Sequence, residues 1–185
     1  ILNECASDTA YGRECYKTQL ELIKSLDVTR PRSFSSCRFK TDICFDLVDV
    51  VSYNIYPKWY HNTPVAMYLD DLYKWVQTTG GAGKPFLITE VGAGAIYGYR
   101  TPAKVKWSEE YQVLALEEQL GAILSYKDCS GVYIWQFCDV RVTNDWWNTR
   151  PRTMNNKGIV DEYRRPKLSY ETVKRIFGSV DTYRK

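Results

Sequence analysis

The stretch PFLITEVG, residues 85–92, places a run of apolar residues ahead of a carboxylate, Glu90, and small residues behind it. Residues 86–89 are short and apolar enough to form a buried strand. In α/β folds the functional side chains gather at the carboxyl ends of the parallel strands. We therefore expect Glu90 to stand at the rim of a pocket.

The opening stretch ILNECAS, residues 1–7, has the same arrangement around Glu4. Apolar residues lead into the acid, and small or polar residues follow it. Two such carboxylates in one chain indicate acid/base and nucleophilic chemistry on a polar substrate.

Helical and strand patterns alternate along the rest of the chain. Apolar residues at helical spacing predict helices over residues 14–26, 64–76, 109–127 and 168–177, with Ser108 as the N-cap of the third. Apolar, β-branched and aromatic runs predict strands over residues 33–37, 49–54, 86–89 and 131–137. This order predicts an α/β fold with a parallel sheet and right-handed crossovers.

Composition narrows the classes of function. A net charge of +3 without a basic stripe argues against nucleic-acid binding, and every apolar run is shorter than the ~20 residues of a membrane span. Aromatic residues make up 15% of the chain, with 15 Tyr and 6 Trp. Aromatic rings suit the C–H faces of carbohydrate as well as ordinary cores and interfaces.

The cysteines give no metal-binding pattern. They lack C-x-x-C spacing, and His61, expected in a loop, is the single histidine, so we expect no metal and no cofactor. Free, buried or half-buried thiols in a reducing compartment are the simplest interpretation of all six: Cys5, Cys15, Cys37, Cys44, Cys129 and Cys138. The lack of an Asn-x-Ser/Thr acceptor is typical of a non-glycosylated bacterial protein, cytoplasmic or periplasmic.

A closed barrel would bring the two glutamates together. A retaining glycosidase holds its two carboxyl groups ~5–5.5 Å apart across the scissile bond, and strands four and seven of an eight-stranded barrel face each other across its mouth. If Glu4 ends strand four, Glu90 ends strand seven and residues 131–137 form strand eight. Residues 1–185 would then be one partial domain: the C-terminal portion of a (β/α)8 TIM barrel, from the end of strand four through helix eight.

At this point the sequence resembles glycoside hydrolase family 2, and within it the β-glucuronidases. Six stretches in family order carry the resemblance: NE (3–4), DVVSYNIYPKWY (49–60), FLITEVGA (86–93), WSEEYQ (107–112), GVYIWQF (131–137) and NNKGI (155–159). It extends through RPK, residues 165–167, and so covers nearly the whole chain.

The resemblance implies that Glu4 is the general acid/base and Glu90 the nucleophile of a double-displacement hydrolysis of terminal β-glucuronides. It also implies that Asn3 hydrogen-bonds the 2-hydroxyl of the sugar. The alternative for Glu90 is a structural role, as a strand-end carboxylate paired with a nearby arginine.

Five further residues receive substrate-binding roles from the same resemblance. Tyr56 and Tyr60 would lie beside the nucleophile, and Trp135 would form the floor of the pocket. Asn155 and Lys157 resemble the pair that holds the substrate carboxylate. This arrangement is sensible because an ammonium and an amide are good hydrogen-bond donors to an anion. Packing or ordinary loop positions are the alternatives for all five.

The family also has features that we do not expect in residues 1–185. These are an N-terminal sugar-binding-type sandwich, an immunoglobulin-like sandwich and the first barrel strands. Gln136 stands where the family commonly has Asn.

Three other functions compete with β-glucuronide hydrolysis. One is a β-galactosidase of the same family. Another is a non-catalytic half-barrel that self-associates through exposed strand edges, and we expect little turnover from residues 1–185 alone. The third is a sugar-binding fragment without hydrolysis.

Overall fold

The computed structural model describes residues 2–180. Its main sheet has four parallel strands in the order β1 (Ser35–Ser36), β2 (Val51–Asn54), β3 (Phe86–Val91) and β4 (Cys129–Ile134). Asn3 forms a further parallel bridge to Ser35, which places the segment around Glu4 beside β1. The alternation of strands and helices confirms the predicted α/β fold with its parallel sheet.

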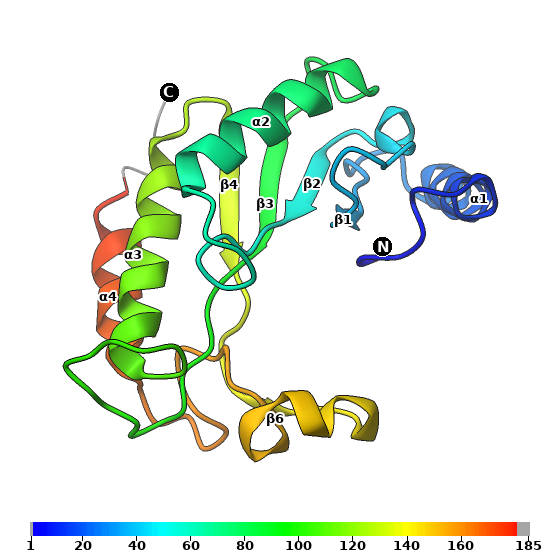
Figure 1. Cartoon of the computed structure of the whole chain (residues 1–185). Coiled ribbons are helices and arrows are strands. Elements are labelled where there is room, and N and C mark those ends of the chain that lie inside the picture. Colours follow the sequence, from blue (N-terminus) through cyan, green and yellow to red (C-terminus); the bar gives the residue numbers. More distant parts are fainter. Residues whose placement is uncertain (1, 181–185) are drawn as a thin grey trace.

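Four α-helices accompany the strands: α1 (Ala10–Leu26), α2 (Val65–Thr78), α3 (Glu109–Ser125) and α4 (Leu168–Gly178). In Figure 1 α2, α3 and α4 lie along one side of the strands, and α1 lies beyond β1 at the other end of the sheet. Ser108 caps α3 as predicted, since its side chain accepts a hydrogen bond from the Tyr111 amide.

Helix α1 begins one turn earlier than predicted. Thr9 is its N-cap and accepts a hydrogen bond from the Gly12 amide. A Cβ at Gly12 would lie only 1.7 Å from the carbonyl oxygen of Ala6, so glycine is required by the close approach of the preceding loop. This first turn escaped prediction because its apolar residues, Ala10 and Tyr11, are exposed and do not extend the buried face of the helix.

The hydrophobic core lies between the sheet and the helices. Helix α2 contributes four fully buried apolar side chains, Val65, Leu69, Leu72 and Val76, which pack in one cluster with the buried residues of β2 and β3. The other face of β4 is open, because Tyr133 is 62% exposed. Strand β4 is therefore covered on one side only, whereas all four residues of β2 are buried.

The strand ends differ from the predictions in ways that matter for the site. Strand β3 continues to Val91, so Glu90 lies within the strand and not after it. Strand β4 ends at Ile134 because the chain then turns to a new partner: the Gln136 amide donates to the Lys157 carbonyl. Strands β1 and β2 are also shorter than predicted. Asp49 lies before the start of β2, where its carboxylate accepts hydrogen bonds from the backbone amide and the guanidinium of Arg32.

Three short 3₁₀ helices and a small second sheet complete the fold. The 3₁₀ helices are η1 (Phe45–Leu47), η2 (Asn144–Thr149) and η3 (Pro151–Thr153). Strands β5 (Val140–Arg141) and β6 (Met154–Asn155) pair antiparallel within the long loop after β4. That loop carries several of the predicted site residues back toward the main sheet.

All six cysteines are free thiols. The expectation that all would be buried or half-buried is wrong for Cys5 and Cys37, which are exposed because they lie in short loops after the strand-end residues. Across residues 2–180, the helices include none with the length and apolar character needed to cross a membrane.

Candidate active site

A pocket of about 450 Å³ lies at the carboxyl ends of the strands. All eight residues predicted for the site line this one pocket: Asn3, Glu4, Tyr56, Tyr60, Glu90, Trp135, Asn155 and Lys157. Six residues that were not predicted for it line it as well: Cys37, Asn54, His61, Tyr68, Trp146 and Arg150. Side chains from distant parts of the sequence are thus brought to one place.

Glu90 is held near the end of β3 with its carboxylate against a tyrosine. The side chain is 8% exposed, and its Oε2 accepts a 2.6 Å hydrogen bond from the Tyr56 hydroxyl. Burial raises the pKa of Glu90, the Tyr56 hydrogen bond opposes that shift, and the charge of Glu4 adds to it. Glu4 and Glu90 are therefore electrostatic neighbours in the pocket.

Burial and the contact with Glu90 both raise the pKa of the Tyr56 hydroxyl. Tyr56 consequently stays protonated at any working pH and acts as a hydrogen-bond donor. A carboxylate that receives such a donor is stabilised in its ionised form.

Glu4 is positioned by its backbone and by an amide side chain. Its backbone amide donates to the Ser35 carbonyl at 2.9 Å, and its φ of 55° bends the chain out of the strand direction. The Asn54 Nδ2 donates at 2.9 Å to Glu4 Oε1 and at 2.9 Å to Asn3 Oδ1. The Thr89 hydroxyl donates to Asn54 Oδ1 at 2.8 Å, which fixes the orientation of this amide.

Lys157 and Arg150 form a cationic wall of the pocket. Lys157 is 3% exposed, and its Nζ donates a 3.0 Å hydrogen bond to the hydroxyl oxygen of Tyr60. The same oxygen accepts a 3.3 Å hydrogen bond from Arg150. The ammonium lies 5.0 Å from the ring centre of Tyr56 and 5.1 Å from that of Tyr60. Within residues 2–180 neither Lys157 nor Arg150 forms an ion pair with a carboxylate.

The pKa shifts agree with an excess of positive charge at this wall. Burial lowers the pKa of Lys157, and the contact with Tyr60 opposes the shift only in part. Burial acts to raise the pKa of Tyr60, but Lys157 and Arg150 outweigh it and lower that pKa. An anionic ligand at the Tyr60 hydroxyl would stabilise both cations.

Asn155 and Trp135 line the pocket from the loops after β4. The Asn155 Oδ1 accepts from the Lys157 amide at 3.3 Å, so the Nδ2 end of this side chain is the donor that can face a ligand. Trp135 directly follows β4 and is partly exposed in the pocket. Both positions suit contacts with a bound sugar ring.

Two of the residues that sequence reasoning missed have direct polar contacts in the pocket. Asn54 is the last residue of β2, so the rule that placed Glu90 at a strand end would have found it too. Arg150 lies in the long loop after β4, where no periodic pattern distinguishes it from its neighbours. In the part of the chain that the structure describes, no group of three or more His, Cys, Asp and Glu side chains could hold a metal ion.

The chain is similar in sequence to curated β-glucuronidases. A β-glucuronidase of Rattus norvegicus is 33% identical over 181 residues, which cover 91% of this chain and 26% of that protein. A β-glucuronidase of Mus musculus is 32% identical over 180 residues, with 91% and 26% covered. The chain thus spans about a quarter of the length of these curated relatives.

Solved structures extend the comparison. The chain superposes with a TM-score of 0.96 on a β-galacturonidase from Eisenbergiella tayi bound to galacturonate, at 72% identity over 98% of this chain and 33% of that one. A β-D-glucuronidase from Dictyoglomus thermophilum gives a TM-score of 0.88 at 26% identity, covering 100% of this chain and 33% of that one. The chain therefore corresponds to about a third of each solved enzyme.

A family model described as "Glycosyl hydrolases family 2, TIM barrel domain" matches residues 1–182. The four parallel strands with their helices form part of such a barrel, as predicted. The chain belongs to glycoside hydrolase family 2.

Proposed function

We propose that the chain is part of a glycosidase that hydrolyses terminal β-uronides by double displacement, with Glu4 and Glu90 as its two catalytic carboxylates. The observation that carries the proposal is the composition of a single pocket. Two carboxylates line it together with the buried Lys157, which forms no ion pair with a carboxylate among residues 2–180. The carboxylates supply the chemistry, and the lysine supplies the selectivity for an acidic sugar.

In the first step Glu90 attacks the anomeric carbon while Glu4 donates its proton to the departing glycosidic oxygen. A covalent glycosyl–Glu90 ester forms, and the aglycone leaves as an alcohol. In the second step Glu4 removes a proton from water, which attacks the same carbon and releases Glu90. The Tyr56 hydrogen bond to Glu90 supports the role of Glu90 as the ionised partner.

Recognition of the uronate carboxylate falls to the cationic wall. Lys157 and Arg150 meet at the Tyr60 hydroxyl, and Asn155 can add a neutral donor. Charge-assisted hydrogen bonds of this kind are about twice as strong as neutral ones. Asn3 and Trp135 would bind the 2-hydroxyl and the ring of the sugar.

Two uronides are candidates. The motif resemblance and the curated relatives favour a β-glucuronide, whereas 72% identity to a β-galacturonidase favours a β-galacturonide. The two sugars differ only in the configuration at C4. We expect the galacturonide to be the better substrate, because the higher identity extends over nearly all of the chain.

A panel of para-nitrophenyl β-glycosides tests the proposal on the complete enzyme. We expect kcat/KM for the galacturonide or the glucuronide to exceed that for the galactoside by about 100-fold, as for a site built around a charge-assisted contact of ~1.5–3 kcal/mol. A preference for the galactoside would contradict the proposal and favour the β-galactosidase alternative.

We further propose that residues 1–185 act within a longer polypeptide that supplies the remaining barrel strands and the N-terminal sandwich domains. The four-stranded sheet and the third of each solved enzyme that the chain covers support this. We expect very low turnover from the chain alone, and a kcat near that of the complete enzyme would contradict this. Self-association through exposed strand edges is the alternative state of the isolated chain, which light scattering would detect.

A further inference from the structure

A buried ion pair lies behind the cationic wall of the pocket and does not touch the pocket itself. Lys167 and Asp139 both have fully buried side chains, with Lys167 Nζ 2.8 Å from Asp139 Oδ1. Lys167 is the N-cap residue of α4, and Asp139 follows β4 in the long loop. Neither residue has a place in the proposed chemistry.

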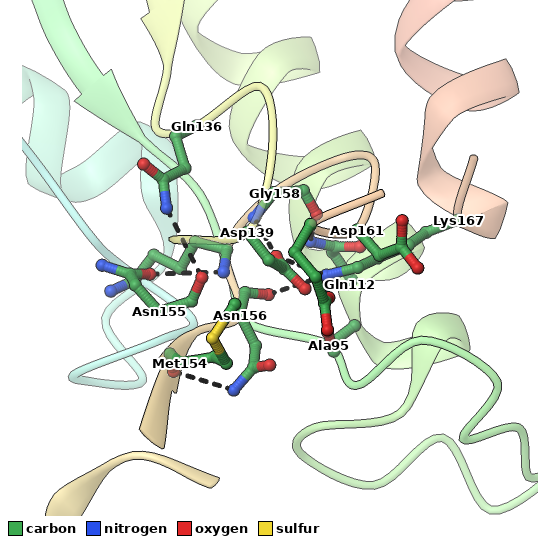
Figure 2. Close-up of polar contacts among 12 residues, drawn as sticks. Ala95, Gln112, Gln136, Asp139, Met154, Asn155, Asn156, Gly158, Asp161 and Lys167 are labelled. Carbon is green, nitrogen blue, oxygen red and sulfur yellow. Dashed lines mark hydrogen bonds and ion pairs between the residues drawn. The ribbon is translucent and has the colours of Figure 1, made fainter. Parts of the chain in front are cut away.

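Every proton of the Lys167 ammonium has an acceptor. Besides Asp139, Nζ donates to the Ala95 carbonyl at 2.6 Å and to the Asn156 carbonyl at 3.0 Å. Figure 2 shows Lys167 reaching toward these groups. The ammonium thus connects the loop that follows β3 to the residue directly before Lys157.

Asp139 holds the residue directly after Lys157. Its Oδ1 accepts a 2.9 Å hydrogen bond from the Gly158 amide, and Gln112 Nε2 donates to the Gly158 carbonyl at 3.0 Å. A Cβ at Gly158 would lie 2.3 Å from the Asp139 backbone nitrogen, so the two segments are in direct contact. Figure 2 shows Asp139, Gly158 and Asn156 gathered around the same point.

The backbone of Lys157 is therefore fixed on both sides by one ion pair. Its own carbonyl accepts from the Gln136 amide at 3.1 Å. A buried ion pair gives little net stability compared with a well-packed apolar pair, because both charges lose their hydration. Positional control of a neighbouring group is a role that an apolar pair could not perform.

We propose that Lys167 and Asp139 are positioning residues, which set the place of the Lys157 ammonium and through it the recognition of the substrate carboxylate. This inference rests on the proposed uronidase function. The pair holds the loop that carries Lys157 against the loop that follows β3. Strand β3 itself carries Glu90. The carboxylate clamp and the nucleophile thus keep a constant separation.

A double-mutant cycle in the complete enzyme tests the proposal. The variants are Lys157→Met, Lys167→Met and the double variant, each assayed for kcat and KM on the para-nitrophenyl β-uronide that the wild type prefers. Lys157→Met removes the ammonium and should lower kcat/KM about 10- to 100-fold. Lys167→Met should lower it by a similar factor, since a misplacement of about 1 Å can cost that much. Both losses should arise mainly in KM. The double variant should be little worse than Lys157→Met, because Lys167 acts through Lys157.

Two further variants keep the test decisive. Asp139→Asn retains the shape and the acceptor for the Gly158 amide but removes the charge, and it should raise KM in the same direction. Lys174→Met is the matched control on α4, since Lys174 is exposed with its Nζ 3.9 Å from Glu171, and it should leave both constants unchanged.

The outcomes separate the two proposals. If Lys157→Met has no effect on the uronide, the proposed function fails and this inference fails with it. If Lys157→Met has its effect but the losses from Lys167→Met and Lys157→Met simply multiply, the function stands and the positioning role is refuted. Failure of both Lys167→Met and Asp139→Asn to fold would show a folding role and would also overturn the inference.

Discussion

The Tyr56 hydroxyl donates a 2.6 Å hydrogen bond to Oε2 of Glu90, and this contact joins the segment after β2 to the strand β3. It is directed at the carboxylate in a site where burial disfavours the charge. The balance between these two effects determines the pH at which Glu90 becomes ionised. Substitutions that remove this contact and other contacts of the pocket test the roles that we propose for its residues.

Replacing Tyr56 with Phe should move the acid limb of the kcat/KM profile to higher pH. Turnover needs ionised Glu90, so the rate falls as the pH drops through the pKa of this group. The Tyr56 hydrogen bond lowers that pKa, and its loss raises the pKa further. At the optimum we expect a loss of about 10-fold. A limb that stays in place or moves to lower pH would contradict the role of Tyr56.

Asn54→Ala should affect proton donation more than nucleophilic attack. Asn54 Nδ2 binds Glu4 Oε1, so its loss leaves the proposed acid poorly oriented. General-acid catalysis contributes ~100- to 10,000-fold for poor leaving groups. We expect kcat/KM for alkyl uronides to fall about 10- to 100-fold, within that contribution, while dinitrophenyl uronides, which need no acid, change little.

Thr89→Val serves as a graded companion to Asn54→Ala. It removes the hydroxyl that donates to Asn54 Oδ1 and should produce a smaller loss in the same direction. Equal losses with both kinds of leaving group, in either variant, would speak against a role of Asn54 in orienting Glu4.

Lys157→Met should remove the preference for an acidic sugar. A charge-assisted hydrogen bond contributes ~1.5–3 kcal/mol, or about 10- to 100-fold in kcat/KM. The loss should appear with uronides but not with the corresponding galactoside. Competition with free galacturonate or glucuronate gives an independent measurement, since its inhibition constant should rise by a similar factor. An unchanged ratio of uronide to galactoside rates would refute the clamp.

Asp42→Ala should destabilise the loop that follows Glu4. The buried Asp42 carboxylate accepts hydrogen bonds from the Ser7 hydroxyl, from the Ser36 hydroxyl at 2.6 Å and from the Cys44 amide at 2.7 Å. Its removal leaves these donors buried without an acceptor, a cost of ~2–4 kcal/mol in the free energy of unfolding. Urea denaturation measures this cost.

Asp71→Ala is the matched control for Asp42→Ala. Asp71 is 56% exposed with an ion pair to Lys40 at 3.1 Å, so its loss should change stability by less than ~0.5 kcal/mol. If both substitutions have the same effect, the buried network around Asp42 does not stabilise the fold as described.

Much of the fold could be predicted from local sequence patterns. The buried run ahead of Glu90 predicted β3, and the apolar spacing of α2 predicted its buried face, because both depend on neighbours along the chain. The exact end of β3 could not be predicted, since it depends on pairing with β4 far along the sequence.

The polar connections of the site were harder to predict. Arg150 reaches Tyr60 across 90 residues of sequence, and Lys167 reaches Ala95 across 72. Contacts between irregular loops leave no periodic pattern. Asn54 differs, because it is the last residue of β2. The strand-end rule that predicted Glu90 at the pocket also predicts Asn54 there.

Covalent trapping tests the central claim most directly. The complete enzyme is treated with a uronosyl fluoride that carries fluorine in place of the 2-hydroxyl, which slows breakdown of the glycosyl–enzyme ester. The digested protein is then examined by mass spectrometry. We predict one sugar per active site, attached to Glu90 in the peptide of β3. A label on Glu4, on another residue, or no label with full activity retained would contradict the account.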